Sequence, residues 1–145
     1  MGMTGTPGFP APNAPAKPAA WKVGGATILT FVALLYVIEL VDQLSGNRLD
    51  RNGIRPLEAD GLWGIVFSPL LHADWAHLIA NTIPALVLGF LVTLAGMSRF
   101  VWSTAIIWIV GGFGTWLIGN VGSCPYETNH IGASGLIFGW FAFLL

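Results

Sequence analysis

The chain has 145 residues, a formal net charge of −1 and a mean hydropathy of +0.72. Only 9% of its residues are charged, against about a quarter in soluble domains, so the composition predicts an all-α protein of the membrane. The six lysines and arginines form no basic stripe, which excludes nucleic acid as a partner and leaves the lipid bilayer as the surrounding medium.

Residues 1–20 are rich in proline, glycine and alanine, and Lys17 is their one charged side chain. Such a stretch buries too little apolar surface to offset the entropy lost on ordering, so we expect a disordered cytoplasmic tail. Residues 21–145 are expected to form the membrane domain.

The first membrane helix is predicted at about 23–41, because no charge occurs between Lys22 and Glu39. Roughly 20 apolar residues suffice to cross a hydrocarbon core of about 30 Å. Asp42 follows Glu39 closely, so we expect both carboxylates at a solvated helix end.

A loop is predicted over 42–71, with half of the basic residues in its first part. Its second part, Leu62–Leu71, is apolar but too short to span a bilayer, which favours a segment lying at the membrane interface.

Two further helices are expected at about 75–96 and 100–118. Pro84 lies inside the former, where neighbouring groups can satisfy the freed carbonyl. The latter carries three glycines that permit close packing between helices, at Gly111, Gly112 and Gly114.

The fourth apolar run, 132–145, has 14 residues, fewer than the roughly 20 that a membrane helix needs. We therefore expect the chain to be truncated within this helix. The polar loop before it, 119–131, contains Cys124, which has no second cysteine with which to form an internal disulfide.

The basic residues that flank the predicted helices give only a weak indication of the orientation in the membrane. Three basic residues flank each side, but Lys22 and Arg99 lie closest to helix ends in short flanks, which favours a cytoplasmic N-terminus.

His77 and Asn81 are four residues apart on the second predicted helix and therefore share one face. Polar side chains in a membrane helix usually face the bundle interior. The pair could form an oxyanion hole, or it could hold helices together through interhelical hydrogen bonds; the spacing alone leaves both open.

Ser134 stands in the sequence Gly-Ala-Ser-Gly, where a polar loop meets the fourth helix. A serine at this point could cap the helix or act as a nucleophile. Gly132 relaxes the backbone at the turn, and Gly135 with Gly139 allows another helix close enough to bring a base to the hydroxyl.

His130 lies four residues before Ser134 and could serve as its base, although an ordinary loop histidine is the simpler interpretation. His72 and His77 lack the spacing of helical zinc ligands, so no metal site is expected.

Two segments together resemble the rhomboid family of intramembrane serine proteases, in particular the actinobacterial type. They are His72-Ala-Asp-Trp-Ala-His77-Leu-Ile-Ala-Asn81 and, two helices later, Gly132-Ala133-Ser134-Gly135. The resemblance covers about residues 22–145 and includes the helix that separates the two segments.

The resemblance implies a six-helix bundle that cleaves transmembrane protein substrates without metal or cofactor. It assigns Ser134 as the nucleophile, His77 and Asn81 as oxyanion donors together with the Ser134 amide, and His72 as a structural histidine. It further implies a multi-pass protein of a bacterial plasma membrane with a cytoplasmic N-terminus. Nothing in the sequence indicates an oligomeric state.

Two departures from the family pattern are visible. Trp63 is followed by Gly64, where many members have Trp-Arg, so the loop is expected to be anchored differently. The family's base is a histidine on the sixth helix, beyond residue 145, so the 145-residue chain alone is expected to be inactive. Two alternatives stay open: a rhomboid-like pseudoprotease that binds membrane proteins without cutting them, and a small transporter or channel subunit.

Overall fold

A computed structural model describes residues 18–122 and 128–145 of the chain. The described residues form five α-helices and three short 3-10 helices, in the order α1 (Ala20–Ser45), η1 (Leu49–Asn52), η2 (Asp60–Trp63), α2 (Gly64–Phe67), η3 (Ser68–Leu70), α3 (Trp75–Leu94), α4 (Met97–Ile118) and α5 (Ser134–Leu144). They contain no β-strand, although Ile54 and His130 form an isolated antiparallel bridge. Cys124 and most of the predicted tail lie outside the described residues.

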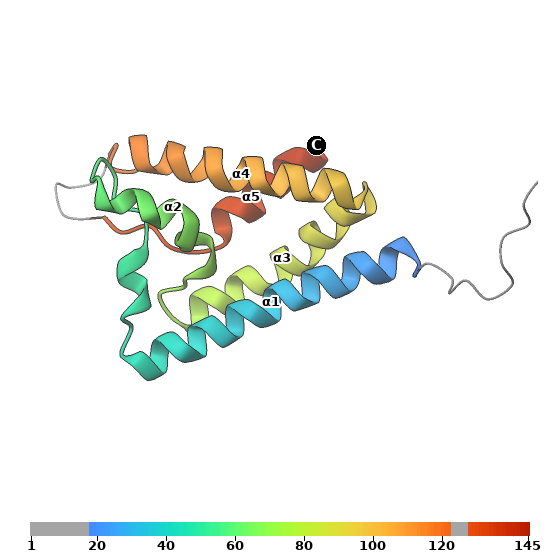
Figure 1. The fold of residues 1–145 in the computed structure, drawn as a ribbon, viewed down its shortest axis with the longest axis horizontal. Coiled ribbons are helices and arrows are strands. Elements are labelled where there is room, and N and C mark those ends of the chain that lie inside the picture. The colour runs from blue at the N-terminus through green and yellow to red at the C-terminus, as the bar shows by residue number, and fades with distance from the viewer. Residues whose placement is uncertain (1–17, 123–127) are drawn as a thin grey trace, which may run out of the picture.

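Three helices, α1, α3 and α4, are long and apolar enough to cross a membrane. The helices α1 and α3 run side by side, and the shorter α5 lies between α3 and α4 (Figure 1). The molecule is therefore a helical bundle in which α5 contacts both α3 and α4.

The hydrophobic core lies where α1, α3 and α5 meet. Trp140 of α5 is at its centre with 1% of its surface exposed, and it packs edge-on against Phe31 of α1. Its indole nitrogen donates to Thr104 Oγ1 of α4 at 2.9 Å, so the buried ring leaves no polar atom unpaired. The buried apolar residues of this core are Ile28, Val32, Leu35, Leu78, Ala85, Val92, Phe100, Ala133, Leu136, Ile137 and Trp140.

A glycine on α3 allows these helices to approach one another. A Cβ atom on Gly89 would lie 2.7 Å from Ile28 Cδ1 and 3.0 Å from the Trp140 ring. Since both neighbours belong to the core, a side chain here would push α1 and α5 away from α3.

The helices differ from their predicted bounds by a few residues at their ends. Helix α1 starts three residues earlier than predicted and continues to Ser45, where Gly46 ends it with a φ of +76°. Helix α4 starts at Met97 rather than at residue 100, and α5 starts at Ser134 rather than at 132. In the latter case the φ of Gly132, +122°, is incompatible with an α-helix.

The predicted solvated end of α1 was wrong. Glu39 and Asp42 are 1% and 2% exposed. After Gly46 the chain folds back over the last turns of the helix, and the Leu49 amide donates to Asp42 Oδ1 at 2.6 Å. The segment after the helix therefore covers Asp42, and Glu39 is bonded within the helix by Gln43. No local sequence pattern predicts this burial.

The loop between α1 and α3 is anchored on α4 by two indoles. Trp108 donates to the Ile65 carbonyl at 2.9 Å, and Trp116 donates to the Glu58 carbonyl at 2.8 Å. Gly112 is the one glycine of its cluster with a close neighbour, the side chain of Ile65, whereas Gly111 and Gly114 face open space.

The close packing around Gly64 explains why the residue after Trp63 is a glycine and not an arginine. A Cβ atom at this position would overlap the backbone of Gly53 and Ile54. The loop is therefore held by close backbone packing and by the indoles of α4.

Candidate active site

Ser134 is held at the start of α5 by a turn that is bonded to the preceding loop. The Gly132 amide donates to the Ser68 carbonyl at 2.8 Å, and the Ala133 amide donates to His72 Nε2 at 3.3 Å. Ser134 itself is the first residue of the helix, half-buried, and no side-chain cap bonds the helix start. Its hydroxyl does not cap the helix, so the capping interpretation loses its support.

His77 and Asn81 both lie in the first turns of α3, four residues apart, so their side chains share one face of this helix. Asp74 caps this helix, and its Oδ1 accepts a hydrogen bond from the His77 amide at 2.7 Å. Asn81 is buried, and its Nδ2 donates to the His77 carbonyl at 3.1 Å. Among the described residues neither side chain makes an interhelical hydrogen bond, which was the alternative that their spacing left open.

The imidazole of His77 and the hydroxyl of Ser134 converge at Gly132. A Cβ atom on Gly132 would lie 2.8 Å from both Cε1 and Nε2 of His77, and 3.8 Å from Ser134 Oγ. Position 132 therefore requires a glycine for two reasons: its φ is positive, and the His77 imidazole leaves no room for a side chain. The fold brings together two side chains that are 57 positions apart in the sequence.

His72 is buried next to this pair, with its ring 5.2 Å from that of His77 between centroids. Burial, and to a smaller extent the charge of His77, lowers the pKa of His72 to about 4. The neutral form is therefore present at physiological pH, and its Nε2 can accept the Ala133 amide proton.

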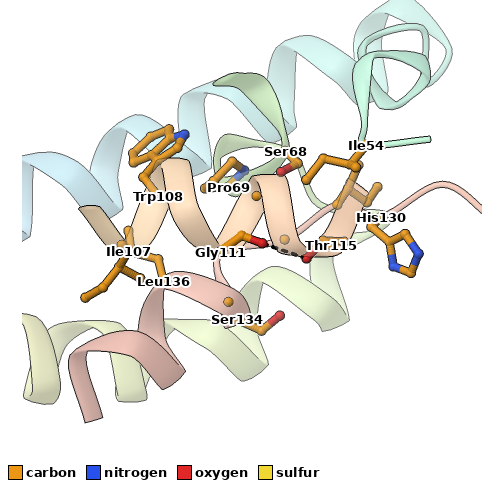
Figure 2. A pocket seen from close by; sticks show the side chains of 14 residues that line it. Ile54, Ser68, Pro69, Ile107, Trp108, Gly111, Thr115, His130, Ser134 and Leu136 are labelled. Carbon is orange, nitrogen blue, oxygen red and sulfur yellow. Dashed lines mark hydrogen bonds between the residues drawn. The ribbon is translucent and has the colours of Figure 1, made fainter. Parts of the chain in front are cut away.

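His130 lies apart from the Ser134 hydroxyl. Its Nε2 faces the end of α4, where a Cβ atom on Gly119 would lie 2.8 Å from it, and this nitrogen is buried without a hydrogen-bond partner. Figure 2 shows the imidazole directed away from Ser134. None of the three histidines is hydrogen-bonded to the Ser134 hydroxyl.

A cavity of about 320 Å³ opens beside Ser134 (Figure 2). The glycines of α4, Gly111 and Gly112, form one wall, and Ser68 with Pro69 forms another. Gly135 lies at its edge on the exposed face of α5, with open space where a side chain would be.

The model of the Rhomboid domain family matches residues 59–145, which include α2 to α5 and every residue of this site. The chain belongs to the rhomboid family.

Curated relatives of this rhomboid chain come from mycobacteria and from Bacillus subtilis. An uncharacterized protein of Mycobacterium tuberculosis is 72% identical over 142 residues, 98% of this chain and 59% of the relative. One of Mycobacterium leprae is 68% identical over 125 residues, 86% of this chain and 50% of the relative. The Bacillus subtilis protein YdcA, provisionally named a rhomboid protease, is 35% identical over 89 residues. These residues make up 60% of this chain and 42% of the length of YdcA.

The rhomboid chain thus spans about three fifths or less of the length of these relatives. No solved structure matches it. The fold class inferred from the sequence, a rhomboid-like helical bundle of the membrane, is confirmed by the family match and by the three span-length helices.

Two residues that position the rhomboid site were not singled out from the sequence. Asp74 could have been recognised, because an aspartate immediately before a helix typically caps it by accepting the amide proton of the third helical residue, here His77. Ser68 acts through its backbone carbonyl, which carries no signal in the side-chain pattern.

Proposed function

We propose that the full-length protein is an intramembrane serine endopeptidase that cleaves transmembrane protein substrates, with Ser134 as its nucleophile. The observation that carries the proposal is the convergence of the Ser134 hydroxyl and the His77 imidazole at Gly132. A hydroxyl and a hydrogen-bond donor on either side of one small space suit the attack on a carbonyl and the stabilisation of the resulting charge.

In this mechanism Ser134 Oγ attacks the scissile carbonyl, and an oxyanion forms between α3 and α5. The His77 ring and the Ser134 amide can donate to the oxyanion, since first-turn amides of a helix have no intrahelical partner. Asn81 can donate as well, because its amide group has two N–H bonds and only one is used by the His77 carbonyl.

The Ser134 hydroxyl also needs a base that takes its proton. No histidine of the chain is hydrogen-bonded to it, and His130 faces the end of α4. We assign this role to a histidine of the full-length protein outside residues 1–145. The base then gives this proton to the leaving amine as the peptide bond breaks, which leaves the acyl-enzyme. Water hydrolyses the acyl-enzyme, so the reaction uses protein groups and water alone.

The neighbouring cavity gives the substrate room beside the nucleophile. Its walls include backbone of α4 at Gly111 and Gly112, so a side chain next to the scissile bond can enter without displacing a residue. The enzyme is proposed to lie in the plasma membrane of a bacterium, with its N-terminus in the cytoplasm.

A fluorophosphonate probe tests the nucleophile directly, because it labels a serine only where a base activates the hydroxyl. The purified full-length protein in detergent should be labelled at Ser134, as identified by peptide mass spectrometry, and the Ser134→Ala variant should not. Absence of labelling in folded wild-type protein would favour a pseudoprotease that binds membrane proteins without cutting them.

A further inference from the structure

Where α1 begins, the described part of the bundle carries basic side chains and no acidic ones. The start of α1 packs against the end of α3, since a Cβ atom on Gly24 would overlap the Thr93 side chain. The turn between α3 and α4 lies at the same end (Figure 1). Lys22 and Arg99 are the basic residues there, whereas every acidic residue that the structure describes lies within residues 39–74, toward the opposite end. The charge of this end therefore favours an anionic ligand.

Two apolar grooves follow the first turns of α1. The first groove has a volume of about 550 Å³ and lies between α1 and α3, where its own lining residues are Trp21, Gly25, Ile28, Leu29, Leu86 and Phe90. The second groove has a volume of about 600 Å³ and is lined on its side by Pro18, Val23, Thr27 and Thr30.

Lys22 and Ala26 line both grooves. At 3.6 residues per turn, these two residues lie between the two sets of α1 residues around the helix. The lysine is therefore the boundary between the grooves, and its ammonium group is available to a ligand that occupies both of them.

The surfaces of the grooves suit hydrocarbon chains. Gly25 gives the first groove its depth: a Cβ atom there would lie 3.8 Å from Phe90 Cε2, so a longer side chain would fill the space. In the second groove the Thr27 hydroxyl donates to the Val23 carbonyl at 2.9 Å and is thus satisfied within the helix. None of the residues that line either groove is acidic.

The ammonium group of Lys22 lies where a lipid headgroup would be expected. Its Nζ is 5.5 Å from the centroid of the Trp21 ring, within the range of a cation–π interaction. Tryptophan and lysine at the end of a membrane helix typically lie at the level of the headgroups. Both ion pairs among the described residues involve Arg55, so no carboxylate there neutralises Lys22.

We propose that the first turns of α1 bind one anionic diacyl phospholipid, with its phosphate on Lys22 and one acyl chain in each groove. Two chains joined to one anionic group match two apolar grooves that share one cation. A zwitterionic lipid offers the same chains, but the cation of its own headgroup competes with Lys22 for the phosphate. Lipid binding at this site needs no protease activity and is independent of the function proposed above.

Native mass spectrometry of the purified full-length protein in detergent tests the site by counting retained lipids during a titration. The probes are dioleoyl phosphatidylglycerol, which is anionic, and dioleoyl phosphatidylcholine, which has the same chains and a zwitterionic headgroup. One lysine near an anionic headgroup contributes about fivefold in affinity, so wild-type protein should bind phosphatidylglycerol about fivefold more tightly. Lysophosphatidylglycerol, with one chain, should bind more weakly, and inorganic phosphate should leave the thermal midpoint unchanged.

Two variants separate the headgroup from the chains. Lys22→Gln should bind both diacyl lipids equally, whereas Arg51→Gln, in η1 beyond the other end of α1, should keep the wild-type preference. Gly25→Leu should weaken the binding of both lipids, because the leucine fills the first groove. Gly114→Leu, with open space at its Cβ on α4, should leave both affinities unchanged. If Gly25→Leu does not fold, Ala26→Leu, at the boundary of both grooves, takes its place.

Equal wild-type affinities for the two diacyl lipids would overturn the proposal and indicate nonspecific lipid around the helix. A wild-type preference retained by Lys22→Gln would also overturn it, as would lysophosphatidylglycerol binding as tightly as the diacyl lipid. Binding by a variant that begins at Pro18, but not by the whole chain, would assign the grooves to residues 1–17 instead of a lipid.

Discussion

Gly132 is the residue on which the site geometry depends most directly. Its φ of +122° is strained for any residue with a side chain, and its position leaves no space beside His77. The glycine thus allows the turn, the imidazole and the hydroxyl to occupy one small region.

Replacing Gly132 by alanine should therefore harm both the fold and the reaction. We expect Gly132→Ala to lower the free energy of unfolding by at least about 1–2 kcal/mol and to reduce turnover of a transmembrane reporter strongly. Thermal unfolding in detergent and reporter cleavage measure the two effects. Gly114→Ala, in a helix with open space at its Cβ, should be neutral or slightly stabilising. Equal behaviour of the two variants would argue against this geometry.

Asn81 combines burial with one N–H that no acceptor in its own helix uses. If that N–H binds the oxyanion, Asn81→Ala should lower kcat about 10²–10³-fold with little change in KM. Steady-state kinetics of the full-length protein provides the measurement, with Ile83→Ala, an exposed position of the same helix, as the control. A decrease of no more than about threefold would remove Asn81 from the oxyanion site.

The elements around the site depend on α4, which anchors the loop before α3. Trp108→Phe removes the hydrogen bond to the Ile65 carbonyl but keeps an aromatic ring. The expected cost is about 1 kcal/mol in the free energy of unfolding. Trp102→Phe, at an exposed position of the same helix, should cost much less. Thermal midpoints in detergent compare the two, and equal midpoints would mean that the indole does not anchor the loop.

The long helices were predictable because apolar runs of 20 residues have few alternatives in a membrane protein. Predicted and observed bounds of α3 differ by two residues at one end. The three 3-10 helices and the one-turn helix α2 between Leu49 and Leu70 were not predicted. Their form depends on tertiary packing, of η1 against α1, of η2 and α2 against α4, and of η3 against α5. Their apolar second half was recognised, but its shape was not.

Spacing alone predicted that His77 and Asn81 share a face. It could not predict that Ser134 lies near His77, because the two residues are 57 positions apart; the family resemblance supplied this expectation. The burial of Glu39 and Asp42 was missed because charged residues near a helix end are usually solvated. For Asp42, the contact with Leu49 after the helix decides otherwise.

At the scale of the whole molecule, α5 has the central place. It packs between α3, which carries the polar pair, and α4, which anchors the loop. Its buried indole, Trp140, bonds Thr104 of α4 and packs against Phe31 of α1. Ser134 therefore stands at the start of a helix that contacts α1, α3 and α4.

The most direct measurement is cleavage of a transmembrane reporter by the full-length protein reconstituted in lipid vesicles. Wild-type protein should cut the reporter, and Ser134→Ala should abolish cleavage while its thermal midpoint stays close to that of wild type. Near-normal turnover by folded Ser134→Ala would contradict the assignment of the nucleophile and, with it, the active site proposed between α3 and α5.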